Sequence, residues 1–265
     1  MKNCRLLVLL LLAAAAWGQT ADIHGLKIKQ SAFDGTTMTL SLTFINDRAA
    51  DVTAYHYCSK LISTDPKQTR EQCVLIDALT PVLEVQADKR ARPGNYELLG
   101  PSVNVVHPGQ ERRIEKRIAW SGVLSGSMSI DAVAWSDDTF EGTAAQTIIA
   151  ERTAELQERQ FVSRTISDTL SGSRDPMVAS AIEILQQELQ ESRASRNACS
   201  PCRERIEYVL MEAILHLQQP ERHKGNGKEF VPDNQREFLK QFQVRYDSFS
   251  EEQAKHVNLR KADAQ

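Results

Sequence analysis

The spacing of apolar residues changes near Gly142, and this change limits the possible folds more than any other feature of the chain. From Leu26 to about Gly142, apolar side chains recur at every second residue, which is typical of strands with one buried face. After Gly142 they recur at every third or fourth residue, which is typical of amphipathic helices. The sequence therefore predicts an α+β protein of two modules, an antiparallel sandwich followed by helices.

The first module is predicted over residues 19–143. Its clearest strand alternates apolar and polar side chains, with Met38, Leu40, Leu42 and Phe44 on one face. Further strands are expected at 52–62, 72–77, 114–120 and 127–135, separated by turn pairs such as Asp34-Gly35 and Pro108-Gly109. No segment between them has helical spacing. This pattern favours an antiparallel immunoglobulin-like β-sandwich of seven or eight strands.

The second module, residues 144–265, is predicted to contain about four helices. They are expected at about 149–170, at 176–194, from Pro201 to Pro220, and from Pro232 onward. Between the last two, a glycine-containing polar segment near 220–230 predicts an exposed loop. The last helix has an aromatic stripe that we interpret as core against the third helix, with a partner groove or dimer seam as the alternative: Phe238, Phe242, Tyr246 and Phe249.

Residues 1–18 have the composition of a secretory signal peptide. Lys2 and Arg5 precede an apolar run that ends at Ala16 and is too short to span a bilayer, and small residues follow at the expected cleavage site. Cys4 precedes the apolar run, so no lipid anchor is expected. No later run approaches the length of a membrane span. We therefore expect an exported protein, periplasmic or extracellular, that begins near Gln19.

Four cysteines follow the predicted leader, and an even number in an exported chain indicates disulfides: Cys58, Cys73, Cys199 and Cys202. Proximity in sequence favours pairing within the first two and within the last two. The Cys199-Ser200-Pro201-Cys202 motif at a helix start also fits a redox dithiol, with Cys199 as the attacking thiolate and Cys202 as the resolving thiol. A zinc site is a weaker alternative, because His216 is the one further ligand that the sequence suggests.

The charged residues give little indication of a nucleic-acid partner. From Gln19 to Ala150 there are 13 basic and 16 acidic side chains, and from Glu151 onward 17 and 19. Nucleic-acid binding normally requires a concentrated positive patch. One basic cluster does occur, on a predicted strand: Arg112, Arg113, Lys116 and Arg117. We interpret it as a charged edge strand that resists aggregation, with binding of an anionic glycan as the functional alternative.

One segment resembles a known type of protein. The run from Ala132 to Gly142, with Trp135 and the acidic turn Asp137-Asp138, is similar to a hairpin in uncharacterised exported bacterial proteins. These combine an immunoglobulin-like β-sandwich with a helical C-terminal region, and in them glycine is usual where Asp138 stands. The resemblance implies the fold and export. It implies no catalytic residue and no ligand.

The sequence thus predicts an exported, non-enzymatic interaction or structural protein. Its partner is expected to be another protein or a component of the cell envelope, and its oligomeric state is left open. No catalytic, cofactor-binding or metal-binding residue is predicted, because the histidines are scattered and no nucleophile elbow or phosphate loop is present. The alternative is a thiol-disulfide exchange protein that uses Cys199 and Cys202.

Overall fold

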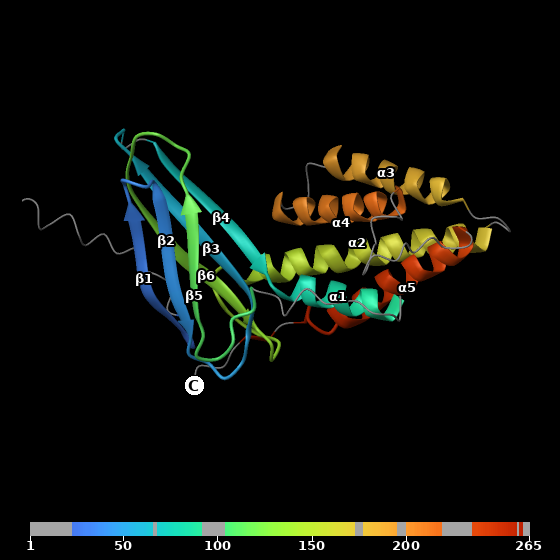
Figure 1. Ribbon diagram of the computed structural model, residues 1–265, viewed down its shortest axis with the longest axis horizontal. Helices are drawn as coiled ribbons and strands as arrows, with labels where there is room; N and C mark the ends of the chain where they lie inside the picture. Colours follow the sequence, from blue (N-terminus) through green and yellow to red (C-terminus); the bar gives the residue numbers. More distant parts are fainter. Residues whose placement is uncertain are drawn as a thin grey trace, which may run out of the picture.

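The computed structural model places two β-sheets at one end of the molecule and a group of helices at the other (Figure 1). It describes residues 23–65, 68–91, 104–172, 177–194, 200–218, 235–258 and 260–261. The predicted leader at 1–18 and the predicted loop near 220–230 lie outside these residues. The α+β class predicted from the sequence is confirmed.

The strands form two sheets. The first sheet has the order β1-β2-β5 and consists of β1 (Leu26–Asp34), β2 (Thr39–Asn46) and β5 (Glu111–Arg117). The second has the order β4-β3-β6-β7-β8 and consists of β4 (Thr69–Asp77), β3 (Val52–Ser63), β6 (Val123–Trp135), β7 (Thr139–Gly142) and β8 (Arg260–Lys261). All neighbouring strands are antiparallel except β8, which pairs with β7 in parallel. The predicted strands are therefore present, and they belong to two sheets.

The two sheets share one apolar core. Leu40, Leu42 and Phe44 of β2 are all completely buried, as their alternation with polar residues predicts. The ring of Phe44 packs edge-on against Tyr55 of β3, with the ring centroids 5.4 Å apart. Ile130 of β6 belongs to the same cluster. The inward residues of both sheets thus bury each other, and their outward residues remain available for other contacts.

Helix α1 (Leu79–Ala91) corrects the expectation that no helix interrupts the β half. It begins directly after β4, where the Asp77 carboxylate accepts a hydrogen bond of 2.9 Å from the backbone N–H of Leu79. This is the capping contact that starts helices. The apolar pattern does not show α1 because its buried face is narrow, with Leu83 and Ala87 packed against Phe249 of the last helix.

The four helices predicted after Gly142 are present: α2 (Ala145–Gly172), α3 (Val178–Ala194), α4 (Ser200–Gln218) and α5 (Gln235–Gln253). The aromatic stripe of α5 is buried, so its interpretation as core is confirmed: Phe238, Phe242, Tyr246 and Phe249. The backbone of α5 lies mainly against α1 and α2, while its side chains share a cluster with those of α4. Among the described helices, none combines enough length with enough apolar side chains to cross a bilayer.

The helical half attaches to the outer face of the five-stranded sheet. Ala145 and Ile148 at the start of α2 pack on Ala54, Ala132 and Ala134, whose small side chains allow a close approach. One turn further along α2, the Arg152 guanidinium lies 2.8 Å from the Asp77 carboxylate at the end of β4. Since α1 packs against α5, a division of the chain at the predicted boundary of 143 would separate α1 from its neighbours.

Candidate functional site

A groove of about 850 Å³ lies where the edges of the two sheets meet. Strand β4 is the edge of one sheet and β5 is the edge of the other, so each strand has a side that pairs with no described strand. The groove is lined by Ser59, Leu61, Thr69, Arg70, Glu71, Gln72, Lys116, Arg117, Ile118, Ala119, Trp120 and Ser121. The lining therefore combines two free strand edges, apolar side chains and three cations. We call it the edge groove.

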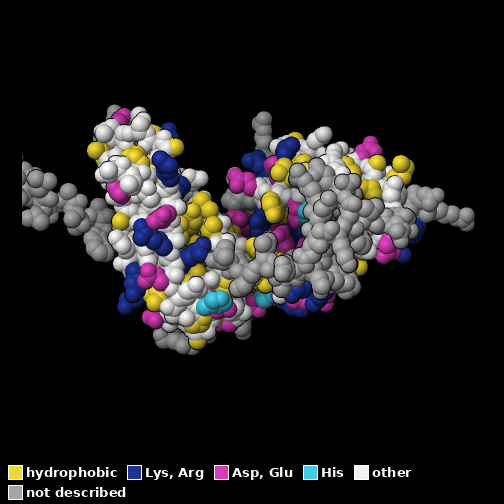
Figure 2. All heavy atoms as spheres, in the orientation of Figure 1, with side chains coloured by type: hydrophobic (Ala, Val, Ile, Leu, Met, Phe, Trp, Pro, Cys, Tyr) yellow, Lys and Arg dark blue, Asp and Glu magenta, His cyan; other side chains and the backbone are white. Residues whose placement is uncertain are grey.

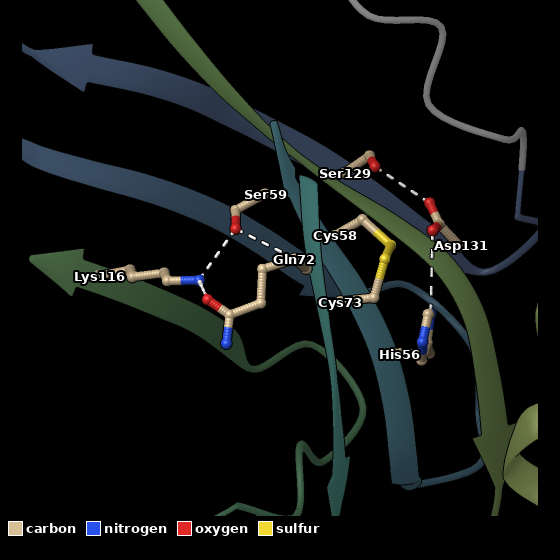
Figure 3. Close-up of a disulfide and its surroundings, with 8 residues drawn as sticks. All are labelled: His56, Cys58, Ser59, Gln72, Cys73, Lys116, Ser129 and Asp131. Atoms are coloured by element: carbon tan, nitrogen blue, oxygen red, sulfur yellow. Dashed lines mark hydrogen bonds and ion pairs between the residues drawn. A yellow bond between two sulfur atoms is a disulfide. The ribbon is translucent and has the colours of Figure 1, made fainter. Parts of the chain in front are cut away.

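Lys116 spans the edge groove from one sheet to the other. Its Nζ donates hydrogen bonds to Ser59 Oγ at 2.9 Å and to Gln72 Oε1 at 2.7 Å (Figure 3). Both partners are neutral, so neither balances the charge of the ammonium. Partial burial lowers the pKa of Lys116 from its usual value, because water is removed from the charged form. An anion in the groove would favour that charged form.

Two arginines share the edge groove with Lys116. The Arg70 guanidinium lies 4.3 Å from the centre of the Trp120 ring, a cation–π contact. Arg70, Lys116 and Arg117 have no carboxylate partner within ion-pair distance in the described part of the chain. Arg113, on the same strand as Lys116, is paired with Glu115 at 2.7 Å. Glu71 is the one acidic side chain among the described lining residues, so these residues give the groove a net positive charge.

The predicted basic cluster is thus divided: Lys116 and Arg117 line the edge groove, whereas Arg112 and Arg113 do not. Figure 2 shows dark blue Lys and Arg side chains over β5, interspersed with acidic ones. Arg113 and Arg117 are exposed, whereas Arg112 and Lys116 are half-buried. Arg112 donates to Asn104 Oδ1 at 2.8 Å. The prediction that β5 is an edge strand is confirmed, and the inward position of Lys116 adds a contact that the sequence does not show.

The Cys58–Cys73 disulfide is confirmed. The two cysteines lie directly opposite each other on β3 and β4, with their Cα atoms 4.0 Å apart. Figure 3 shows the bond beside His56 and Asp131. Cys73 is exposed and Cys58 is buried. The disulfide fixes the register of β4 against β3, and β4 forms one side of the edge groove.

Replacement of Cys73 by alanine is expected to destabilise the sandwich by about 3 kcal/mol. The bond closes a loop with a sequence separation of 15 residues, and the chain-entropy model gives that stabilisation for such a loop. Thermal unfolding under oxidising conditions, followed by circular dichroism, measures the effect. An unchanged midpoint would show that the bond adds no stability.

The second predicted disulfide is not described completely. Cys202 is disulfide-bonded, and its predicted partner Cys199 lies outside the described residues. The pairing of these two cysteines, and the redox role that the motif allows, therefore stay predictions.

A second group of charged side chains is buried among the helices, and we call it the ionic cluster: Glu84, Glu155, Arg159, Glu212 and Arg245. Arg159 Nη2 lies 2.7 Å from Glu84 and 3.0 Å from Glu155. Arg245 Nη2 lies 2.8 Å from Glu212. Three carboxylates and two guanidiniums from α1, α2, α4 and α5 thus pair with one another. The sequence shows only the Glu155–Arg159 pair, four residues apart on α2, because the other members lie far apart in the chain.

The pKa values in the ionic cluster follow from this pairing. Burial alone would raise the pKa of Glu212, but Arg245 and Arg159 outweigh that effect and lower it to about 2. Burial raises the pKa of Glu84, as does the nearby charge of Glu212, although Arg159 partly opposes both effects. The two carboxyl groups therefore shift in opposite directions. Since each charge has a partner, we assign the cluster to stability.

Comparison with known proteins identifies no relative: no protein-family model, curated protein or solved structure matches the chain. The hairpin at 132–142 has the turn predicted from its sequence, and Asp137 there pairs with Arg48 at 2.8 Å. Arg48 also lies over the ring of Trp135, 4.5 Å from its centre. The resemblance to exported bacterial proteins remains a prediction, and the edge groove is assigned on its own chemistry.

Proposed function

We propose that this chain is an exported, non-enzymatic interaction protein whose edge groove binds an extended acidic segment of another protein. The observation that carries the proposal is the absence of a carboxylate partner for Arg70, Lys116 and Arg117 in the described chain. Lys116 is partly buried, Arg70 and Arg117 are exposed, and cations without such a partner favour an anionic ligand.

The hydroxyl of Ser59 contacts the amine of Lys116, and an enzyme could use such a pair as a nucleophile and its base. The arrangement of the two groups favours a binding role over catalysis. Ser59 is 2% exposed, and its hydroxyl donates to the backbone carbonyl of Gln72 at 3.1 Å. The hydroxyl proton is therefore directed away from the amine, and a substrate has little access to the oxygen.

The free edges of β4 and β5 favour a peptide over a sugar polymer. An added strand would satisfy the backbone N–H and C=O groups along one of these edges, while acidic side chains reach the cations. A glycan could use the cations but not the strand edges. Trp120 is only partly buried and provides apolar surface for a side chain of the peptide, with the buried Leu61 and Ile118 beneath the groove.

The strand order supports an immunoglobulin-like sandwich as the scaffold. In that fold the third, sixth and seventh strands share one sheet, and the first, second and fifth share the other. Here β3, β6 and β7 are neighbours in one sheet, and β1, β2 and β5 form the other, while β4 pairs with β3 and not with that other sheet as the fourth strand of the constant type does. Export is supported by the composition of residues 1–18 and by the Cys58–Cys73 disulfide, because disulfides persist in oxidising compartments.

Replacing all three groove cations by glutamine, in R70Q/K116Q/R117Q, is expected to weaken binding of a poly-glutamate peptide at least about tenfold. Each replacement removes an attraction of about 0.5–1 kcal/mol, so the three together remove at least about 1.4 kcal/mol, which corresponds to a factor of ten. Tryptophan fluorescence can follow the titration, since Trp120 lies against Arg70. Hydrogen exchange measures strand addition directly, because amides along β4 or β5 should become protected when the peptide binds.

A matched control removes the same charge elsewhere. Lys27, Lys29 and Lys89 are exposed and lie outside the edge groove, so K27Q/K29Q/K89Q is expected to keep the affinity of the native protein. Equal weakening of peptide binding by both triple variants would show that the edge groove is not the binding site. Tight binding of heparin together with no binding of the peptide would contradict the proposal and would identify a sulfated glycan as the ligand of the groove.

A further inference from the structure

His56, Cys58 and Cys73 form a cluster of potential metal ligands beside the sandwich core. His56 and Cys58 are two residues apart on β3 and therefore lie on the same face, and Cys73 lies opposite Cys58 on β4. One ring nitrogen of His56 and the two sulfur atoms are all within 4.8 Å of one another. Figure 3 shows these residues with Asp131 next to the histidine. Two cysteines and one histidine make a typical donor set for zinc.

The environment of His56 suits a metal ligand. Its side chain is 12% exposed, and its Nδ1 has no hydrogen-bond partner among the described residues. The Asp131 carboxylate lies 3.8 Å from Nδ1, and Ser129 Oγ donates to its other oxygen at 3.0 Å. Asp131 is therefore the residue that would orient the imidazole for metal binding.

We propose that reduction of the Cys58–Cys73 bond creates a zinc site formed by His56, Cys58 and Cys73. In the site His56 binds zinc through Nε2, and its Nδ1–H donates to Asp131, the arrangement that orients histidine ligands in zinc proteins. The fourth position is taken by water. The site is distinct from the edge groove. Reduction thus converts a structural disulfide into a metal centre that forms only in the reduced protein.

The reaction is balanced with a dithiol as the reductant. The dithiol gives two electrons and two protons to the S–S bond, which breaks to leave two thiols, and the dithiol itself becomes a disulfide. Zinc binding then forms two Zn–S bonds and releases the two protons. Reoxidation by a disulfide reverses these steps and releases the metal. The exposure of Cys73 gives the reductant access to one sulfur.

The geometry requires only a small rearrangement. Once the bond between the sulfur atoms is broken, tetrahedral zinc with Zn–S bonds near 2.3 Å needs them about 3.8 Å apart. The Cys73 side chain is exposed, so it is free to rotate toward this separation once the bond is broken. Pairing of β3 with β4 continues on both sides of the cysteines and keeps the ligands together.

Cobalt(II) tests the proposal, because thiolate-bound tetrahedral cobalt has a strong visible spectrum. The native chain, reduced by a phosphine that is then removed without air, is expected to bind one cobalt ion more than the reduced C58S/C73S variant. Subtracting the cobalt bound by the variant removes any contribution of Cys199 and Cys202 to cobalt binding, because both proteins contain these two cysteines. The oxidised chain is expected to lack this additional ion, and zinc should displace it from the reduced chain.

The variant His56→Asn is expected to weaken the additional cobalt binding at least about tenfold and to change its spectrum, since a ligand is lost. His107→Asn is the matched control, because His107 is exposed, pairs with Asp51 and lies outside the cluster. Equal cobalt binding by the reduced native chain and C58S/C73S would overturn the proposal. So would unchanged binding in His56→Asn, or loss of the β-sheet circular dichroism on reduction.

Discussion

Replacement of Arg159 by methionine is expected to destabilise the protein by about 3–5 kcal/mol at neutral pH. The Arg159 side chain is 1% exposed and lies 2.7 Å from Glu84, 3.0 Å from Glu155 and 3.4 Å from Glu212. Methionine has a similar shape but no charge, so Glu84 would lose its partner and the other two carboxylates would each lose one of theirs. Removal of one member of a buried ionic group has costs of this size. Urea unfolding followed by circular dichroism measures the change.

The effect of Arg159→Met should depend on pH. The pKa of Glu212 in the folded protein is lowered to about 2, so its contribution to stability is present above its ordinary pKa of 4.5 and is lost as the pH falls toward 2. The difference between native protein and variant should therefore decrease over this range, because protonation removes the unbalanced charge. Arg164→Met on the same helix is the control, since Arg164 is exposed and should change stability by less than about 0.5 kcal/mol. Equal losses in the two variants would contradict a paired role for Arg159.

The parts of the fold that the sequence predicts are those that depend on local patterns. Alternation of apolar and polar residues identifies β2 because one face is completely buried and the other is not. Helical spacing identifies α2 to α5 because each packs an apolar face against its neighbours. The Cys58–Cys73 pair was predictable because the two residues lie on adjacent strands. In each case, one contact surface determines the pattern along one segment.

The expectation for α1 was wrong because apolar spacing was the main criterion. The buried residues of α1 are Thr80, Leu83, Ala87 and Ala91. They include a single large apolar side chain, which is too little to produce a clear helical period in the sequence. The signals that identify α1 are Asp77 as the cap and Pro81 in the first turn. These signals are chemical and local, so the sequence does indicate where the helix begins.

The candidate sites could be predicted only in part, because each depends on pairing between distant segments. The sequence shows the basic residues of β5, but the groove also needs Arg70 on β4, and the strand order decides that these edges meet. His56 lies two residues before Cys58, a spacing that places both on one face of a strand, and this was the available signal for the metal cluster. The ionic cluster joins four helices, and its one local pattern is the pair of Glu155 and Arg159 four residues apart on α2.

Replacement of Gly142 by alanine is expected to destabilise the sandwich by about 4 kcal/mol or more. Gly142 ends β7 with a φ of 107°, a conformation that side-chain-bearing residues rarely adopt. A Cβ atom there would lie 2.1 Å from the carbonyl oxygen of Asp131 and 2.6 Å from the Cα of Ala132, both on the neighbouring strand β6. The strain and the contact with rigid backbone add together, so β7 would have to separate from β6. Thermal or urea unfolding measures the loss.

Substitution of two other glycines separates the effect of backbone strain from the effect of the steric contact. Gly109 has a φ of 75°, and an added Cβ atom would meet nothing within 4 Å, so Gly109→Ala should show the strain alone, about 1 kcal/mol. Gly172 has neither a left-handed φ nor a close neighbour, and Gly172→Ala at the end of α2 should be neutral or stabilising by up to about 1 kcal/mol. A loss for Gly142→Ala no larger than that for Gly109→Ala would mean that β7 does not approach β6 as closely as the structure shows. Because α2 begins three residues after Gly142, the close pairing of β7 with β6 lies directly before the start of the helical half.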